Sequence, residues 1–271
     1  MTTDSAGTQA HGTADEQPYS LAGSRLGSGA VQYLRRASEV LLRAAEDEQA
    51  NLVEASTRIV DRLTRGGLIH TFGTGHSHLM AEEVFYRAGG SARVNPLLVD
   101  ALMLHVSASG SSALERQTGL AAELLETHPM QSDDVLIVAS NSGGNAVSVE
   151  LAALARERGV LVIALTSLNH ARSQQGRSGA DSRLHEQADI VLDNHGAPGD
   201  ACLPVPGSDA VVGPTSTVVG AALLNALMAE VTFQMVARGL DPEIFASANT
   251  SGGDERNAAL LSRYRSHIRA L

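Results

Sequence analysis

The chain has 271 residues, of which 43% are hydrophobic and 18% are charged, a composition typical of a globular protein with a sizeable core. A net charge of −10, no run of Arg and only 3% aromatic residues argue against a basic or base-stacking surface, so we expect no nucleic-acid partner. All 20 basic residues are Arg, which excludes Schiff-base and P-loop chemistry that needs a lysine.

The N-terminal region divides into a tail and a helical segment. Residues 1–28 are rich in small and polar residues and hold almost no large apolar side chains, so we predict a disordered tail. A single domain is predicted over residues 29–271. Within it, residues 31–65 repeat apolar side chains at helical spacing among Glu and Arg, which predicts one long or two short amphipathic helices.

From Leu68 onward, short apolar runs alternate with segments of helical period. The predicted strands are 68–72, 92–96, 134–139, 160–165 and 190–192, and the predicted helices between them are 79–88, 114–127 and 145–158. Strands that are apolar throughout, separated by helices, are typical of a parallel sheet covered on both faces. The sequence therefore predicts an α/β fold.

The last third of the chain is less regular. Residues 194–214 are rich in Pro, Gly and Asp and are predicted to form a long loop before a helix at 216–238. Residues 241–271 are predicted to form a C-terminal cap. Small polar residues are dense at 245–257, where Asn249 and Asp254 either bind a sugar's polar groups or, in the case of Asp254, only cap the final helix.

Two polar, glycine-rich turns each follow a predicted strand and open a predicted helix. They are Gly73-Thr74-Gly75-His76-Ser77 and Ser140-Asn141-Ser142-Gly143-Gly144. Such turns expose backbone N–H groups that bind anions, and serine hydroxyls add donors for phosphate oxygens. A dinucleotide site would need a third glycine where His78 stands, so we predict no dinucleotide cofactor.

With the cluster Thr215-Ser216-Thr217 at the start of the late helix, these turns resemble the sugar isomerase (SIS) domain family. That family has a Gly-x-Gly-x-Ser turn, a Ser-x-Ser-Gly-x-Thr turn and a late Ser/Thr cluster, and Asn145 here replaces the usual Thr. The resemblance covers about residues 31–240. It implies a five-stranded parallel sheet in a flavodoxin-like three-layer sandwich, with N-terminal and C-terminal helical extensions. It also implies a sugar-phosphate ligand and a homodimer or homotetramer with sites near the subunit interface.

The resemblance assigns the polar residues to two parts of a ligand. Phosphate binding falls to Ser77, Ser140, Asn141, Ser142 and Asn145. Sugar binding falls to Gly75, His76, Ser216 and Thr217. Apart from the resemblance, His170 is a sugar-binding candidate because it follows the predicted strand 160–165, although a plain surface loop is the favoured interpretation, and Asn249 and Asp254 are candidates because they lie in the polar C-terminal segment.

Enzymes of this family generally remove a proton next to the carbonyl of the open-chain sugar, which requires a base near the phosphate. Glu82 and Glu83 lie five and six residues after Ser77, and only one of two adjacent helical residues faces a cleft. Phosphoheptose isomerases place functional side chains on this helix, and the position matches Glu83. Glu83 is therefore the preferred catalytic base and Glu82 the alternative, and two solvated glutamates remain an open interpretation.

His76 and His78 have His-x-His spacing, which can indicate a metal. A metal site needs three or four ligands, and no further ligand is evident, so we predict no metal. One of these histidines, with His78 as the catalytic candidate, could open the sugar ring or relay a proton.

Three functions fit this arrangement. The isomerase domain of glucosamine-6-phosphate synthase relies on a lysine, which this chain lacks. N-acetylmuramic acid 6-phosphate etherase uses carboxylates and no cofactor. The chain is similar to it in offering carboxylates near the phosphate site, although it does not reproduce that enzyme's downstream motifs. The leading prediction is a cofactor-independent dehydratase- or etherase-type lyase that acts on an amino-sugar 6-phosphate of the N-acetylglucosamine 6-phosphate class. The alternatives are an aldose–ketose isomerase and a non-catalytic sugar-phosphate sensor.

The sequence also bears on location. The only cysteine, Cys202, has no partner for a disulfide, and the N-terminus lacks the basic and apolar parts of a signal peptide. No uninterrupted apolar stretch approaches the roughly 20 residues of a membrane span. We therefore expect a cytoplasmic protein with no membrane partner.

Overall fold

The computed structural model of the chain describes residues 27–173, 182–247 and 253–271. Most of the predicted disordered tail lies outside these ranges. Its last residue, Ser28, already belongs to the first helix, so the helical segment begins three residues earlier than predicted.

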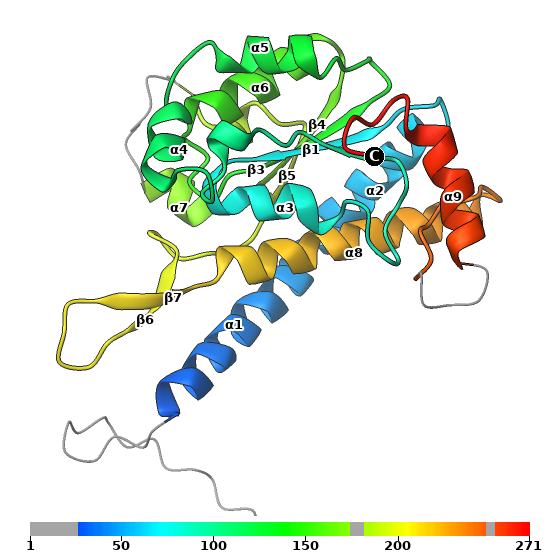
Figure 1. Cartoon of the computed structure of the whole chain (residues 1–271). Helices are drawn as coiled ribbons and strands as arrows, with labels where there is room; N and C mark the ends of the chain where they lie inside the picture. Colours follow the sequence, from blue (N-terminus) through cyan, green and yellow to red (C-terminus); the bar gives the residue numbers. More distant parts are fainter. Residues whose placement is uncertain (1–26, 174–181, 248–252) are drawn as a thin grey trace, which may run out of the picture.

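Five parallel strands form a central sheet in the order β2-β1-β3-β4-β5 (Figure 1). The strands are β1 Ile69–Gly73, β2 Val94–Pro96, β3 Val135–Ala139, β4 Leu161–Thr166 and β5 Ile190–Asp193. The predicted α/β fold with a five-stranded parallel sheet is confirmed. Because the chain runs from β1 to β2 on one side and returns to β3 on the other, the carboxyl ends of β1 and β3 flank a switch point, where open α/β sheets bind ligands.

Helices cover both faces of the sheet. Successive side chains of a strand point to opposite faces, and because both sets are apolar here, each face packs against helices in a core of its own. Val135, Ile137 and Ala139 face the core built with α2 (Gln49–Leu63), α3 (His78–Glu83) and α8 (Ser216–Ala237). Leu136 and Val138 face the core built with α5 (Leu120–Thr127) and α6 (Ala146–Glu157). Each fully buried Val, Leu or Ile contributes about 1.5–3 kcal/mol, so these cores need few aromatic residues.

The predicted helices are present, with shifted limits. Residues 31–65 form two helices, α1 (Ser28–Asp47) and α2. Of the helix predicted at 114–127, only α5 is present, because Gly119 takes a left-handed φ of 91° just before it. A separate helix that was not predicted, α4 (Ala108–Leu114), ends where the predicted helix was to begin. The remaining short elements are η1 Gly75–Ser77, η2 Asp100–Leu102, α7 Leu168–Ser173, η3 Leu184–Glu186 and α9 Gly253–Tyr264.

The prediction of an irregular loop at 194–214 was wrong for its second half. Strands β6 (Ala201–Pro204) and β7 (Val211–Pro214) pair as an antiparallel hairpin that lies beside α1 (Figure 1). The prolines that indicated a loop are tolerated because a two-stranded hairpin consists only of edge strands. Tyr33 of α1 donates a hydrogen bond from its hydroxyl to the Pro214 carbonyl over 2.8 Å and so fastens the hairpin.

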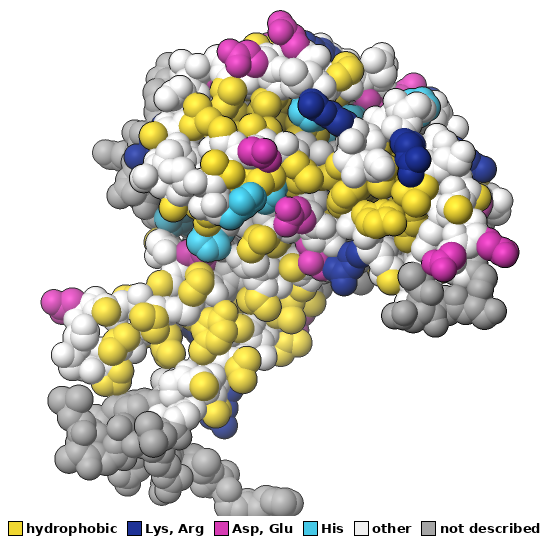
Figure 2. All heavy atoms as spheres, in the orientation of Figure 1, with side chains coloured by type: hydrophobic (Ala, Val, Ile, Leu, Met, Phe, Trp, Pro, Cys, Tyr) yellow, Lys and Arg dark blue, Asp and Glu magenta, His cyan; other side chains and the backbone are white. Residues whose placement is uncertain are grey.

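Helix α8 is the one described helix that is long and apolar enough, by length and composition alone, to cross a membrane. Core helices of globular proteins pass the same test, and here eight α8 residues are buried. Its outward side also carries apolar side chains, including Phe233, which is 69% exposed. Figure 2 shows further apolar side chains over α1 and the hairpin.

A buried carboxylate fastens the C-terminal cap to the sheet. Glu243 accepts hydrogen bonds from Arg93, Arg263 and the Tyr264 hydroxyl, and so joins the segment before β2 to α9. Burial by itself raises the pKa of the Glu243 carboxyl, but these hydrogen bonds outweigh burial and lower the pKa. Burial and the bond to Glu243 raise the pKa of Tyr264 to about 12.

Replacing Glu243 by Gln should destabilise the protein by about 2–3 kcal/mol at pH 7, since it weakens hydrogen bonds made to a charged group. The ionised carboxylate stabilises the fold above its ordinary pKa of 4.5, and this contribution is lost as the pH falls through the lowered pKa. Urea unfolding at pH 7 and below pH 4 should therefore show the two proteins converging in acid. Glu255→Gln on the exposed side of α9 is the matched control, and an equal loss in both variants would contradict the assignment.

Candidate functional site

The first glycine turn reverses the chain tightly at the end of β1. A Cβ on Gly73 would lie 2.1 Å from the Ser77 carbonyl oxygen, so no other residue fits there without moving the backbone. Gly75 has a φ of 57°, a left-handed value that glycine adopts without strain. Thr74 donates from its hydroxyl to the Glu115 carboxylate over 2.6 Å, which holds the turn in place.

The second glycine turn leaves β3 beside the first. Gly73 pairs directly with Ala139, so the residues that follow the two strands emerge together. Gly143, at a φ of 60°, donates its N–H to the Ser140 carbonyl and closes the turn. Helix α6 then begins at Ala146.

The start of α8 is the third part of the site. The Asp200 carboxylate accepts the Thr215 N–H at 3.1 Å and the Ser216 N–H at 2.9 Å. It also accepts the Ser216 hydroxyl at 2.6 Å. Because the hydroxyl proton is engaged, the Ser216 oxygen has only lone pairs to offer a ligand.

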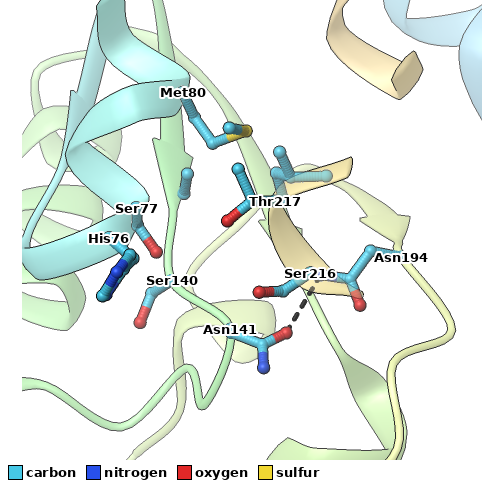
Figure 3. A pocket seen from close by; sticks show the side chains of 10 residues that line it. His76, Ser77, Met80, Ser140, Asn141, Asn194, Ser216 and Thr217 are labelled. Carbon is cyan, nitrogen blue, oxygen red and sulfur yellow. Dashed lines mark hydrogen bonds between the residues drawn. The ribbon is translucent and has the colours of Figure 1, made fainter. Parts of the chain in front are cut away.

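These three parts line a pocket (Figure 3). The residues that line it are His76, Ser77, Met80, Ala139, Ser140, Asn141, Leu165, Asn194, Ser216 and Thr217. The hydroxyls of Ser77, Ser140 and Thr217 and the amide nitrogen of Asn141 have no hydrogen-bond partner among the described residues. No carboxylate lines the pocket, so it presents unengaged donors without a negative charge.

A second, more open hollow adjoins the pocket and shares Met80 and Thr217 with it. Glu83, whose side chain is 31% exposed, accepts hydrogen bonds there from Arg87 and from Asn225. Glu82 also lines this hollow and is 50% exposed, with the ring of His78 3.1 Å from its carboxylate. Both candidate bases thus border the same space.

Six of the predicted ligand residues line the pocket, and the other predicted ligand residues that the structure describes do not. The six are His76, Ser77, Ser140, Asn141, Ser216 and Thr217. Gly75 shapes the first turn without lining the pocket. Ser142 accepts the Gly144 N–H, and Asn145 is the N-terminal cap residue of α6.

Three further predicted residues are described and do not line the pocket. His78 is buried and reaches the adjoining hollow only through Glu82. His170 accepts the Gly199 N–H beside the hairpin. Asp254 lies on α9, at the opposite end of α8 from Ser216 (Figure 1). Asn249 lies outside the described residues. Within the described ranges, no three His, Cys, Asp or Glu residues cluster as metal ligands would.

Asn194 is the polar pocket residue that the sequence reasoning missed. It follows β5 directly, at the same edge of the sheet as both turns. The rule that ligands gather at the carboxyl ends of parallel strands would have found it. Asp200 was also missed, because its contacts to α8 depend on the course of the hairpin.

The geometry has counterparts in known proteins. Residues 32–167 match the family model described as the SIS domain. The UPF0309 protein BH0227 of Halalkalibacterium halodurans is 42% identical over 238 residues, which are 88% of this chain and 95% of that protein. A UPF0309 protein of Geobacillus thermodenitrificans is 41% identical over 240 residues, covering 89% of this chain and 96% of that protein. A phosphoheptose isomerase structure from Francisella tularensis has the same fold, with a TM-score of 0.50, 18% identity and coverage of 78% of this chain and 100% of that one.

Replacing Gly73 by Ala should damage the site and the fold together, since the added methyl group would overlap the Ser77 carbonyl. We expect a loss of roughly 1–3 kcal/mol in stability, measured by thermal unfolding. Gly29→Ala is the matched control, because a Cβ there meets nothing within 4 Å and the residue is helical. If Gly73→Ala left the unfolding midpoint at the control's value, the described turn would be incorrect.

Proposed function

The chain belongs to the SIS-domain proteins of the UPF0309 family, and on that premise we propose that the pocket between its glycine turns holds the phosphate of a sugar phosphate. The observation that carries the proposal is the convergence of the Ser77, Ser140 and Thr217 hydroxyls and the Asn141 amide on a space without a carboxylate. A phosphate dianion accepts several hydrogen bonds at once and matches such a set of donors.

Neutral donors suffice to hold a dianion here. Each hydrogen bond to a charged group contributes about 1.5–3 kcal/mol, and four such bonds offset much of the cost of removing phosphate from water. The chain has no lysine, and no Arg lines the pocket. Binding should therefore depend on directed hydrogen bonds more than on a salt-sensitive attraction between opposite charges.

The sugar part of the bound sugar phosphate would occupy the adjoining hollow. A ligand with its phosphate in the pocket would extend past Thr217 and Met80, the two residues that both spaces share. Its carbon chain would then lie beside Glu82 and Glu83. The Ser216 oxygen, whose proton is held by Asp200, would accept a hydrogen bond from a sugar hydroxyl.

We propose Glu83 as the base that takes the proton from C2 of the open-chain sugar. Arg87 and Asn225 hold its carboxylate in position, which limits the freedom of the side chain. Glu82, hydrogen bonded to His78, is the second titratable group at the hollow and would supply or return a proton. No carboxylate other than these two lines either space among the described residues.

Two reactions begin with that proton. In the leading proposal the substrate is an amino-sugar 6-phosphate, and the C2–H electrons form a C2–C3 double bond while the C3 substituent leaves with a proton as water or an alcohol. In the alternative, the proton returns at C1 and an aldose becomes a ketose. The fold likeness to a phosphoheptose isomerase favours keeping this second candidate. A sugar-phosphate sensor would bind without either reaction.

A second copy of the chain is the proposed partner, in a homodimer or homotetramer. Leu34 and Leu42 on α1 are 64% and 65% exposed, and Phe233 on α8 is 69% exposed. Large apolar side chains gathered over neighbouring helices are typical of protein interfaces. Val218, beside the pocket residue Thr217 at the start of α8, is 45% exposed, so such an interface would reach the neighbourhood of the site.

Ser140→Ala should weaken phosphosugar binding roughly tenfold or more, since it removes one hydrogen bond to a charged group. Ser142→Ala is the matched control, because Ser142 lies in the same turn but does not line the pocket. Isothermal titration with a panel of hexosamine, hexose and heptose phosphates gives the affinities. Equal losses in the two variants would contradict the assigned phosphate site.

Glu83→Gln should reduce turnover by about 100-fold or more while phosphosugar affinity stays within a few-fold, since only the general base is lost. Glu82→Gln, at the adjacent position, is the comparison. Incubating the unaltered protein in heavy water with N-acetylglucosamine 6-phosphate and, separately, with glucose 6-phosphate separates the reactions, because elimination lowers the mass of the first sugar, whereas aldose–ketose isomerisation needs the C2 hydroxyl of the second and adds deuterium to it. A protein that binds phosphosugars yet neither exchanges nor eliminates would support the sensor.

A further inference from the structure

We infer that Asn194, buried directly after β5, fixes the orientation of the Asn141 side-chain amide and thereby makes the second turn a donor to phosphate. The inference rests on the proposed phosphate site. It assigns to Asn194 a positioning role, because Asn194 acts on the ligand through Asn141.

The orientation of the Asn194 side-chain amide is set by a backbone N–H group, which can only donate a hydrogen bond. The Gly196 N–H lies 2.9 Å from Oδ1 of Asn194. An N–H cannot accept a hydrogen bond, so the Asn194 atom that faces it must be the oxygen and not the nitrogen. Gly196 is itself held, because the buried Ser167 hydroxyl donates to its carbonyl over 2.7 Å.

A hydrogen bond from Asn194 in turn fixes the orientation of the Asn141 side-chain amide. With its oxygen turned to Gly196, Asn194 donates from Nδ2 to Oδ1 of Asn141 over 3.0 Å, the bond drawn in Figure 3. The oxygen of Asn141 is then engaged. Its Nδ2 is the polar side-chain atom left for a ligand in the pocket that Asn141 lines.

The surrounding backbone leaves little freedom for another arrangement. Asn194 is only 3% exposed, and its N–H donates to the Thr166 carbonyl. The carbonyl of Asn141 accepts the Ser167 N–H at 3.2 Å and the Thr166 hydroxyl at 3.3 Å. A Cβ on Gly196 would lie 2.9 Å from Oδ1 of Asn194, so a glycine is needed for this close approach.

The orientation decides which ligands the turn accepts. An unrestrained asparagine amide can rotate by half a turn and present either an oxygen or a nitrogen. A half-turn of Asn141 would set two amide N–H₂ groups against each other and leave both unsatisfied. Asn194 therefore excludes the state in which the Asn141 oxygen would repel a phosphate oxygen.

The test is Asn194→Asp, which keeps the shape of the side chain and can still accept the Gly196 N–H. The new carboxylate cannot donate to Asn141, so the Asn141 amide should turn and present its oxygen to the pocket. We expect affinity for the phosphosugar that the unaltered protein binds best, and for inorganic phosphate, to fall roughly 10- to 100-fold.

A double-mutant cycle with Asn141→Ala separates this effect from repulsion by the new charge. If Asn194 acts through Asn141, Asn194→Asp in the Asn141→Ala background should weaken binding at least about fivefold less than it does in the unaltered protein. An equal loss in both backgrounds would overturn the inference while leaving the proposed function intact. If the unaltered protein bound neither a phosphosugar nor inorganic phosphate, the proposed function itself would fail and the inference with it.

Thermal unfolding of each variant checks that the fold survives. If Asn194→Asp does not fold, Asn194→Ala replaces it in the same cycle, because it removes the anchor of Asn141 without adding charge. A coupling of less than about twofold between Asn194→Ala and Asn141→Ala would overturn the inference.

Discussion

The parallel pairing of β1 with β3 is the constraint on which the site depends. It sets Gly73 opposite Ala139, so that both turns leave the sheet at one edge and side by side. Neither turn alone forms the pocket, since Ser77 follows one strand and Ser140 the other. The buried Val, Ile and Leu residues of the two cores hold the strands in this register, and the positions of the Ser77, Ser140 and Asn141 donors follow from it.

The acidic groups near the site are arranged so that an anion can enter. The chain carries a net charge of −10, yet each nearby carboxylate is engaged by a partner of its own. Asp200 accepts the N–H groups at the start of α8, and Glu115 accepts the Thr74 hydroxyl. Glu83 is paired with Arg87 in the adjoining hollow. The pocket is left with neutral donors, and the carboxylates remain where proton transfer would need them.

The strands and turns that a local sequence pattern determines could be predicted, whereas the features that depend on contacts between distant residues could not. The strand before the second turn is apolar throughout, the strand before the first is a short β-prone run, and Gly73 and Gly75 mark a reversal that few other residues allow. The β6–β7 hairpin was missed because its position depends on Tyr33, which is 181 residues from its partner Pro214 in the chain. The six pocket residues were predictable from the turns and the late Ser/Thr cluster. Asn194 could have been found as a pocket residue from its place after the last strand, but its contact with Asn141 arises only when β5 comes to lie beside β4.

A crystal structure of the protein with a bound phosphosugar would show directly whether the pocket between the two turns holds the phosphate. We expect phosphate oxygens within hydrogen-bond distance of the Ser77 and Ser140 hydroxyls and of the Asn141 amide nitrogen. We also expect C2 of the sugar to lie beside the carboxylate of Glu83. A phosphate bound elsewhere would contradict the proposed phosphate site, and a phosphate facing the oxygen of the Asn141 amide would contradict the proposed orientation of Asn141.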